Sequence, residues 1–522
     1  MRRLLGGAAA LAALTFAVPA GAQDQADVPP PLAVATPVSQ AQIDAAVGQL
    51  DAIAQRLMAR TGVPGMSIAV VHADRLVYAK GFGVRSTATN APVDADTVFQ
   101  LASVSKPLGA SVVARAVGRR VVAWDDLVTE HLPWFKLRNP STTRQLTIAD
   151  LYAHRSGLPD HAGDLLEDLG YDRTQILRRL RYLPLTPIRS RYAYTNFGMT
   201  AAAQAVADAA RTSWPALSER LIYRPLGMRS TSSRYADFAR SPNHAELHVQ
   251  VDGTWQPRFQ RDADAQSPAG GASSSATDMA RWMRMELAEG RFDGRPIVPA
   301  AALLATFTPH IATAPVVPAA AARPSFYGLG MDLGTDQTGR VRLSHSGAFA
   351  LGAATTVWMV PDLELGIVVL SNGAPIGMVE SVAQEFLDLA EQGRVTRDWF
   401  AAYAPLFADL LADHGTLAGR PRPAQPAPAR AARAYAGRYG HNPYYGPVRV
   451  SARRGRLALH LGAGGRTTLR LRHWSGDTFT TVPPGENGGS ISAVRFSRPR
   501  AGRPTTLTIE YLDAEGLGRF RR

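Results

Sequence analysis

Hydrophobic and polar residues recur along this chain with two different periods, and the period predicts where helices and strands lie. Apolar residues at helical spacing indicate amphipathic helices, whereas shorter apolar runs bounded by polar turns are typical of strands. The elements predicted in the longer part of the chain are a helix at 43–58, a hairpin of strands at 65–71 and 75–82, a helix at Ala276–Leu287, a second hairpin at Ala353–Val360 and Leu365–Ser371, and a helix at Met378–Gln392.

The segment between the two hairpins, about 127–289, is mixed and mostly helical. Strands at both ends of a region with helices between them indicate one sheet assembled from distant segments, together with a helical subdomain. We therefore expect an α/β (α+β) architecture over residues 41–415, in which an antiparallel sheet is flanked by helices.

A change in composition marks a second unit. Residues 416–433 are rich in Pro, Ala and Arg and predict a semi-rigid linker. Beyond it, short strands separated by glycine turns predict a small all-β barrel or sandwich over 434–522. The strands predicted there are 448–451, 457–461, 467–472, 479–482, 491–496 and 505–511.

The first residues resemble an export signal. Two arginines precede an apolar stretch at 4–18, and Ala20-Gly21-Ala22 fits a small-x-small cleavage pattern. We expect a signal peptide at 1–22, a flexible leader at 23–40 and a periplasmic or secreted protein, with an uncleaved anchor as the alternative. No later apolar run is long enough for a membrane span. The chain has no Cys, which excludes disulfides, cysteine nucleophiles and Cys-type zinc sites.

Positive charge is distributed unevenly. The formal net charge is +14, and residues 432–522 hold 16 arginines against five acidic residues. Residues 23–431 carry only +1 by the same count. We expect the basic tail to bind an anionic cell-envelope polymer or to gate a cleft in the main domain, with a solvated arginine-rich surface as the alternative. Predicted export and the absence of a nucleic-acid motif argue against a nucleic-acid partner.

Lysine is rare here, and one lysine follows a serine at a chemically useful spacing. Of 57 Lys and Arg residues only Lys80, Lys106 and Lys136 are lysines. Lys106 lies three residues after Ser103, so the two side chains share one face of a helix. Arginine cannot release its proton near neutral pH, but a lysine with a lowered pKa can. Lys106 is thus a candidate base beside a serine nucleophile; the alternative is that codon bias spared a few lysines at random.

Two further motifs follow in order. They are Tyr194-Thr195-Asn196, ahead of a helix, and His345-Ser346-Gly347-Ala348, on the strand before the second hairpin. The order Ser-x-x-Lys, Tyr-x-Asn, His-Ser-Gly resembles the signature of penicillin-binding proteins and serine β-lactamases, in the branch of class C β-lactamases, D-alanyl-D-alanine carboxypeptidases and CubicO-type hydrolases. The resemblance covers roughly 41–411, and the tail resembles the lipocalin-like β-domain appended to some of these enzymes.

The resemblance implies a role for each motif residue. Ser103 attacks a carbonyl and forms an acyl-enzyme, while Lys106, Tyr194 or both move its proton; the sequence leaves that choice open. The implied substrate contacts are Asn196, His345, Ser346 and Gly347, and the implied oxyanion hole consists of the backbone N–H groups of Ser103 and Ala348. No metal and no organic cofactor is implied.

One departure bears on the substrate. Class C β-lactamases have lysine at the position of His345, and a histidine is mostly neutral at pH 7. This favours a peptidase or esterase, acting on a small-molecule or peptide substrate, over an efficient β-lactamase. We expect a serine hydrolase that cleaves peptide or amide bonds, D-amino-acid peptides first, or esters. The alternatives are an esterase with little peptidase or β-lactamase activity and a non-catalytic envelope-binding protein that kept the fold.

Overall fold

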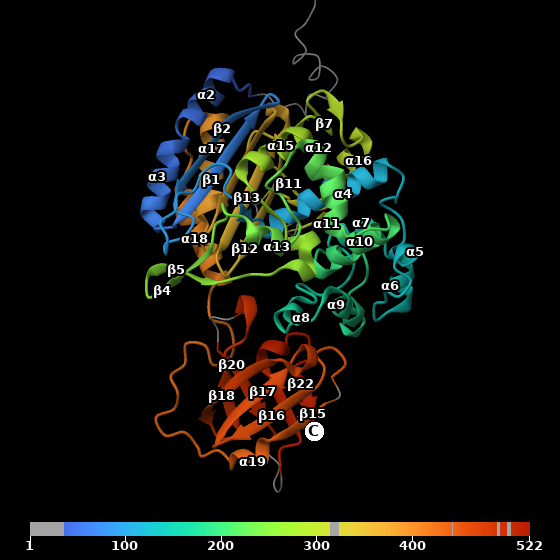
Figure 1. Ribbon diagram of the computed structural model, residues 1–522, viewed down its shortest axis with the longest axis vertical. Coiled ribbons are helices and arrows are strands. Elements are labelled where there is room, and N and C mark those ends of the chain that lie inside the picture. Colours follow the sequence, from blue (N-terminus) through green and yellow to red (C-terminus); the bar gives the residue numbers. More distant parts are fainter. Residues whose placement is uncertain (1–35, 314–322, 441, 488–490, 498–502) are drawn as a thin grey trace, which may run out of the picture.

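The computed structural model describes residues 36–313, 323–440, 442–487, 491–497 and 503–522, and it contains two eight-stranded antiparallel sheets (Figure 1). The expected signal peptide at 1–22 and residues 23–35 of the expected leader lie outside the described residues. Across the part of the chain that is described, no helix combines the length and the apolar character needed to cross a membrane.

The first sheet joins the two ends of the main domain, as the predicted hairpins implied. Strand β1 pairs with both β2 and β14, so the N-terminal hairpin continues directly into the C-terminal one. The strands, in sheet order, are β2 (Arg75–Gly83), β1 (Gly65–His72), β14 (Leu365–Ser371), β13 (Ala353–Val360), β12 (Val341–Phe349), β11 (Asp332–Thr335), β10 (Phe326–Tyr327) and β9 (Ile311–Ala312).

Helices bury both faces of this sheet. In β1, Ile68 and Val70 pack into one apolar cluster while Ala69 and Val71 pack into another. Because both faces are covered, the strand reads as a continuous apolar run rather than as an alternation. One face is covered by α2 (Gln40–Gly48), α3 (Leu50–Thr61) and α17 (Met378–Gln392), with α18 (Trp399–Leu410) packed outside α17, and the other face is covered by α15 (Ala276–Leu287).

The predicted helix at 43–58 is in fact two helices. Gln49 separates α2 from α3, and Gly48 ends the first of them. Glycine is a poor helix former and permits the break, which apolar spacing alone does not reveal. The other predicted helices agree with the structure: α15 begins after Ser275, whose side chain accepts a hydrogen bond from the Asp278 N–H.

A helical region lies beside the sheet and carries two small hairpins, β4 (Leu247–Val251) with β5 (Thr254–Phe259) and β7 (Arg291–Phe292) with β8 (Arg295–Pro296). It also holds a short antiparallel pairing of two segments distant in sequence, β3 (Phe99–Gln100) and β6 (Ser273–Ser274). Its helices are η2 (Ala102–Val104), α4 (Ser105–Gly118), α5 (Val128–His131), α6 (Pro140–Gln145), α7 (Ile148–Tyr152), α8 (Asp164–Asp168), α9 (Arg173–Arg179), η3 (Leu180–Tyr182), α10 (Asn196–Ala209), α11 (Trp214–Ser218), η4 (Glu219–Tyr223), α12 (Arg224–Leu226), α13 (Tyr235–Arg240), η5 (Asp264–Gln266), α14 (Ser267–Gly270), α16 (Ala300–Leu304) and η6 (Ala305–Phe307). The mixture of helices and sheets agrees with the predicted fold class.

The C-terminal sheet forms a nearly closed antiparallel barrel, as the pattern of short strands predicted. An isolated bridge between Gly440 and Arg521 brings its two edges together. The edge strands β15 and β22 were not predicted because each has only three residues. The strands are β15 (Gly437–Tyr439), β16 (Val448–Arg453), β17 (Arg456–Leu461), β18 (Thr467–Ser475), β19 (Thr478–Thr481), β20 (Ser492–Phe496), β21 (Thr506–Ile509) and β22 (Arg519–Arg521), with α19 (Ala432–Tyr435) and the turns η9 (Gly485–Asn487) and η10 (Glu510–Leu512).

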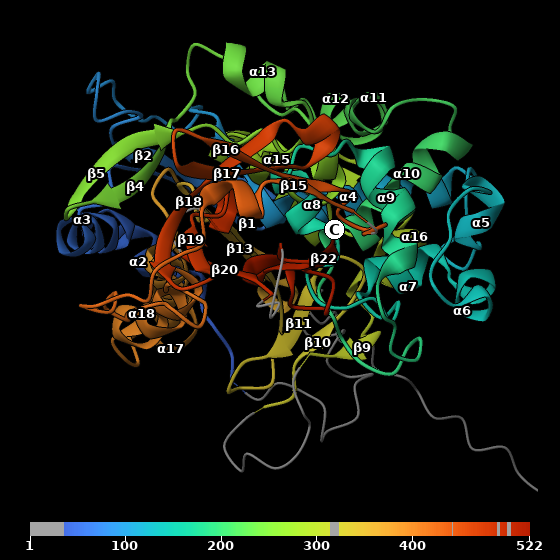
Figure 2. The same ribbon diagram turned by 90° about the horizontal axis from the view of Figure 1, so that it is seen from below.

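This barrel packs against α8 and the residues that follow it in the main domain. The Tyr171 hydroxyl donates to the Tyr445 carbonyl (2.7 Å), and the Ala463 N–H donates to the Leu169 carbonyl (3.1 Å). Leu169 and Tyr445 also belong to one continuous buried cluster. Seen from below, the barrel lies in front of the main domain (Figure 2). The second sheet therefore adjoins the same surface to which α8 and α10 contribute.

Candidate active site

Ser103 is held on a strained turn between a strand and a helix. It lies in η2, directly ahead of α4, and Pro107 falls in the first turn of α4, where proline is tolerated. Ala102 has φ +46°, a left-handed conformation that costs free energy in any residue other than glycine. The Leu101 N–H donates to the Ala272 carbonyl (2.9 Å) and thereby anchors this turn. The surrounding structure thus fixes the candidate nucleophile before a substrate binds.

Lys106 is fully buried beneath Ser103. Its Nζ lies within hydrogen-bond distance of three oxygens: Ser103 Oγ (2.9 Å), Asn196 Oδ1 (2.7 Å) and the Ala269 carbonyl (2.8 Å). Burial lowers the pKa of Lys106 to about 7, against the opposing effect of Asp164 and Asp332. A neutral amine would donate its two hydrogens to the amide and backbone oxygens and direct its lone pair at Ser103.

Tyr194 approaches the same serine from the other side. Its hydroxyl donates to Ser103 Oγ (2.6 Å), and its ring lies 4.4 Å from Lys106 Nζ. Burial raises the pKa of Tyr194 above its ordinary value. Tyr194 therefore stays protonated at neutral pH, whereas Lys106 can lose its proton, which separates the two roles that the motif left open.

His154 positions the loop that carries Tyr194. The Ala193 N–H donates to the His154 carbonyl (2.9 Å), and the Thr195 N–H donates to His154 Nδ1 (3.2 Å). The imidazole packs against the Tyr194 ring, with centroids 4.7 Å apart. Burial lowers the pKa of His154 well below its ordinary value, so the ring remains a neutral acceptor.

Asn196 is the first residue of α10 and bridges two ionisable groups. Besides accepting from Lys106, it donates through Nδ2 to Asp164 Oδ2 (2.9 Å). His161 Nδ1 lies 2.9 Å from the same carboxylate oxygen. Asp164 was not predicted from the sequence, because no motif marks α8.

The residues of the His-Ser-Gly motif alternate along β12. Ser346 and Ala348 line the pocket above Ser103, whereas His345 is buried behind Tyr194. His345 Nδ1 donates to the Ser346 carbonyl (2.7 Å), so Nε2 accepts from the Tyr327 hydroxyl (3.0 Å). Burial and the neighbouring Lys106 lower the pKa of His345 to about 3, and the ring is therefore neutral.

Gly347 lies where β12 touches the turn that carries Ser103. A Cβ at this position would collide with the Leu101 carbonyl and Thr355 Oγ1 and would lie 2.9 Å from the Ser103 nitrogen. Thr355 Oγ1 also donates to the Leu101 carbonyl (2.7 Å). Glycine thus lets the strand and the nucleophile turn approach each other closely.

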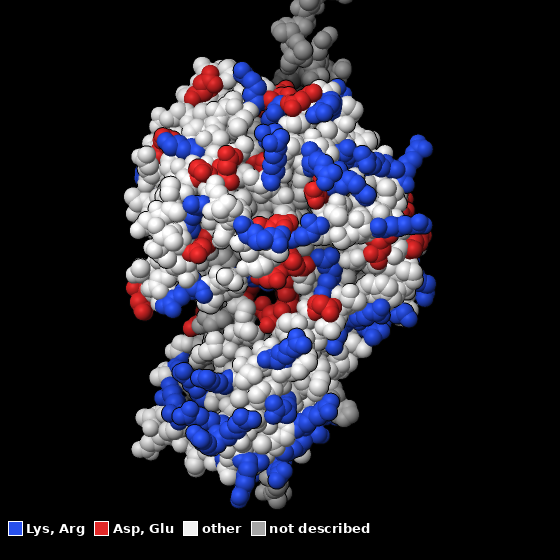
Figure 3. All heavy atoms as spheres, in the orientation of Figure 1, with Lys and Arg blue, Asp and Glu red and all other residues white. Residues whose placement is uncertain are grey.

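A pocket of about 630 Å³ lies above Ser103, and the main domain and the barrel domain share its walls. The main domain contributes Tyr194, Asn196 and the residues around α8, while the barrel contributes Tyr444, Tyr445 and Tyr511. Figure 3 shows a hollow at this junction, with acidic side chains gathered around it. The barrel residues were not predicted, since their proximity to Ser103 depends on how the two units dock.

Arg261 connects the two walls. Its Nη2 lies 2.5 Å from Glu167 Oε2 in α8, and its Nε lies 2.9 Å from Glu486 Oε1 in the barrel. Gln266 donates to the same Glu167 oxygen. This buried arginine lines the pocket, yet its charge is already shared by two carboxylates.

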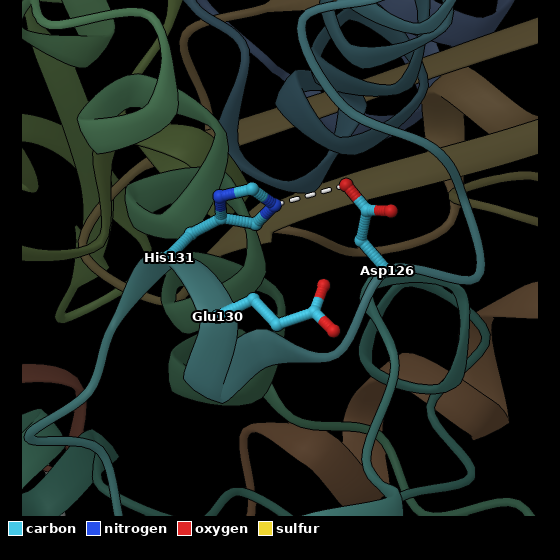
Figure 4. Close-up of side chains that lie close together, drawn as sticks. All are labelled: Asp126, Glu130 and His131. Atoms are coloured by element: carbon cyan, nitrogen blue, oxygen red, sulfur yellow. Dashed lines mark hydrogen bonds and ion pairs between the residues drawn. The ribbon is translucent and has the colours of Figure 1, made fainter.

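One group of potential metal ligands occurs among the described residues, away from this pocket. The ligand atoms of Asp126, Glu130 and His131 lie within 4.8 Å of one another (Figure 4). His131 Nε2 lies 2.9 Å from Asp126 Oδ2, which also accepts from the Ala123 N–H (2.9 Å). These bonds hold a turn ahead of α5, and the group is partly exposed.

Comparisons with known proteins agree with this geometry. The family model described as Beta-lactamase matches residues 50–391, and the model described as Domain of unknown function (DUF3471) matches residues 421–518. Unguisins hydrolase ungD of Aspergillus violaceofuscus is 26% identical over 484 residues, which cover 86% of this chain and 85% of that protein. D-alanyl-D-alanine-carboxypeptidase/endopeptidase AmpH of Escherichia coli is 24% identical over 243 residues, which cover 46% of this chain and 61% of that protein.

The fold is also found among solved structures. The octameric penicillin-binding protein homologue from Pyrococcus abyssi superposes with a TM-score of 0.57 at 19% identity, covering 91% of this chain and 100% of that one. The strand order of the first sheet, the Ser103–Lys106–Tyr194 arrangement and the family match point the same way. Because the family model covers well over half of the sequence, this chain belongs to the β-lactamase family, the β-lactamase/transpeptidase-like serine hydrolases that its motifs resemble.

Proposed function

We propose that this protein is an exported hydrolase that forms an acyl-enzyme on Ser103. The observation that carries the proposal is the position of Ser103 Oγ, 2.9 Å from Lys106 Nζ and 2.6 Å from the Tyr194 hydroxyl. A serine hydroxyl is a weak nucleophile unless an adjacent base takes its proton. The lowered pKa of Lys106 supports that role, and the signal-like residues at 1–22 support export to the periplasm or beyond.

In this mechanism neutral Lys106 accepts the Ser103 proton as Oγ attacks the substrate carbonyl. The backbone N–H groups of Ser103 and Ala348 stabilise the oxyanion of the tetrahedral intermediate. When the intermediate collapses, the bond to the leaving group breaks, and the proton passes from Lys106 through the Tyr194 hydroxyl to that group. Water then attacks the acyl-enzyme, which releases the acid and returns a proton to Ser103.

For the substrate we propose a peptide or amide, with D-amino-acid peptides first and small esters second. Asn196 and Ser346 line the pocket and have amide and hydroxyl groups for the substrate backbone. His345 and Gly347 contribute indirectly. His345 packs behind Tyr194 and supports it, and Gly347 leaves room for the turn that carries Ser103. The neutral His345 ring offers no permanent cation to a drug carboxylate, which disfavours efficient β-lactam hydrolysis.

For the barrel we propose contact with an anionic envelope polymer through its outer surface. Exposed arginines follow neighbouring strands there, and their side chains are spread over the lower domain in Figure 3. The clearest group is Arg449, Arg453, Arg456, Arg470 and Arg472 on β16, β17 and β18. The full chain should be retained on dextran sulfate at low salt, and replacing three of these arginines by Ala should weaken retention. Unchanged retention in the triple variant would contradict this contact.

The acyl-enzyme proposal is tested by labelling purified protein with a fluorophosphonate probe and with a fluorescent penicillin. Wild type should be labelled by the fluorophosphonate, and Ser103→Ala should not be. Turnover of D-alanyl peptides and p-nitrophenyl esters by Ser103→Ala should fall about 10⁴-fold or more. Penicillin labelling would direct the substrate search to D-peptides, and its absence would direct it to esters. Folded wild-type protein without label or turnover would favour a binding protein.

A further inference from the structure

The pocket above Ser103 has a strong excess of negative charge. Six carboxylates line it, against the guanidinium of Arg261 and the imidazoles of His161 and His414. Acids therefore outnumber cations even when both histidines are protonated. The lining carboxylates are Asp160, Asp164, Glu167, Asp168, Glu486 and Glu515.

Two of these carboxylates lie on opposite walls and are open to solvent. Asp160 belongs to the main domain and Glu515 to the barrel, and neither forms an ion pair with any residue that the structure describes. Burial raises the pKa of Tyr194, and the charge of Asp160 adds to that shift. Burial raises the pKa of Tyr444 and Tyr445 on the opposite wall, and the charge of Glu515 adds to both shifts.

A third carboxylate, that of Glu167, has one buried oxygen without a hydrogen-bond partner among the described residues. The Glu167 side chain is only 6% exposed, and its Oε2 is bonded to Arg261 and Gln266. Its Oε1 has no hydrogen-bond partner among the described residues, although the residue lines the pocket. A buried oxygen without a donor is costly, so Glu167 keeps acceptor capacity and negative charge beside the pocket that its described neighbours do not fully satisfy.

We propose that this pocket selects substrates that carry a positively charged nitrogen, such as an ammonium group, near the scissile carbonyl. This inference rests on the proposed acyl-enzyme function and names the substrate class for that site. The cation lies between the walls, with Asp160 and Glu515 as its nearest exposed partners, and an anionic substrate is repelled. Opposed carboxylates in a partly enclosed cleft raise the local concentration of cations and orient them.

Matched ester pairs test the proposal on the full-length protein. On the acyl side, p-nitrophenyl 6-aminohexanoate is compared with the neutral heptanoate and with the anionic monoester of pimelate. On the leaving-group side, butyrylcholine is compared with 3,3-dimethylbutyl butyrate. For at least one of the two cationic esters, kcat/KM should be about tenfold higher than for its neutral partner. The kcat/KM for the anionic pimelate ester should be about tenfold lower than that for the heptanoate. Both differences should become smaller in 0.5 M salt, which screens the charges.

The double variant Asp160→Asn with Glu515→Gln should reduce the cationic-to-neutral ratio about tenfold. Asp252→Asn is the matched control, because Asp252 is exposed on the β4–β5 turn outside the pocket and asparagine tolerates its positive φ. Equal kcat/KM for both members of each pair, or a ratio unchanged in the double variant, would overturn this inference alone. Absence of all ester turnover and of Ser103 labelling would instead remove the proposed function on which it rests.

Discussion

The floor and the roof of the pocket are built differently. On the floor, Ser103, Lys106 and Tyr194 come from the main domain and are joined by direct hydrogen bonds of 2.6 to 2.9 Å. The roof comes from the barrel and consists mainly of tyrosine rings and carboxylates, of which Tyr444 and Glu515 are examples. The hydrogen bonds on the floor fix the positions of the reacting atoms. Side chains on the roof can be replaced without breaking those hydrogen bonds. The floor is therefore suited to chemistry and the roof to selection of the substrate.

The largest effect is expected when the floor loses its proton acceptor. Lys106→Arg keeps a cation and several donors, but a guanidinium cannot take the Ser103 proton. We expect kcat to fall by about 10³- to 10⁴-fold, within the range that general bases contribute. Steady-state ester hydrolysis and the rate of fluorophosphonate labelling measure the loss. Lys136→Arg, at an exposed lysine, is the control. Activity near that of wild type in Lys106→Arg would mean that Tyr194 acts as the base.

The close approach of β12 to the floor is tested at Gly347. In Gly347→Ala the new methyl group would push the strand away from Leu101 and Ser103. We expect kcat to fall about 100-fold, because a small displacement of a nucleophile is costly, and the free energy of unfolding to fall by about 1–3 kcal/mol. Gly334→Ala on β11 is a matched control, since a Cβ there meets no atom within 4 Å. The assignment fails if both variants lose activity equally.

The dependence of kcat/KM on pH reports the protonation of Lys106 and the effect of nearby carboxylates on it. Because the pKa of Lys106 is lowered to about 7 and its neutral form is the base, kcat/KM should rise with pH through about 7 and then level off. Asp164 raises this pKa, so Asp164→Asn should move the rising limb to lower pH. Asp252→Asn should leave the limb in place. A limb that does not move, or moves to higher pH, would contradict the coupling.

Much of the floor could be predicted from local sequence, and the roof could not. The spacing of Ser103 and Lys106 places both side chains on one face of a helix, whatever that helix packs against. The strands β13 and β14 and the helix α17 also begin and end at the residues where their apolar patterns begin and end. The hydrogen bond that Lys106 donates to Asn196 depends on the packing of α10, which periodicity does not encode. The acidic walls combine segments near residues 160, 486 and 515. Residues 160–168 hold four acidic residues and no lysine or arginine, but the barrel as a whole is basic, so only the docked structure reveals that Glu486 and Glu515 complete the acidic pocket.

The smallest effect, and the sharpest test of the contrast between floor and roof, concerns one hydrogen bond between the two domains. The Gly163 N–H donates to the Tyr444 hydroxyl (3.1 Å) next to α8, and Tyr444→Phe removes that acceptor. We expect the free energy of unfolding to fall by about 1 kcal/mol and KM to rise about two- to fivefold, with a smaller change in kcat.

Tyr439→Phe is the matched control for this prediction, because its hydroxyl donates to the Tyr435 carbonyl (2.9 Å) within the barrel and does not line the pocket. It should cost similar stability and leave KM unchanged. Thermal unfolding and initial rates on one ester series measure both variants. If Tyr444→Phe lowered kcat as strongly as it raised KM, the roof would also be orienting the reacting groups. The division between chemistry on the floor and substrate selection on the roof would then be wrong. A substitution on the roof would have changed how the substrate is oriented against Ser103 on the floor.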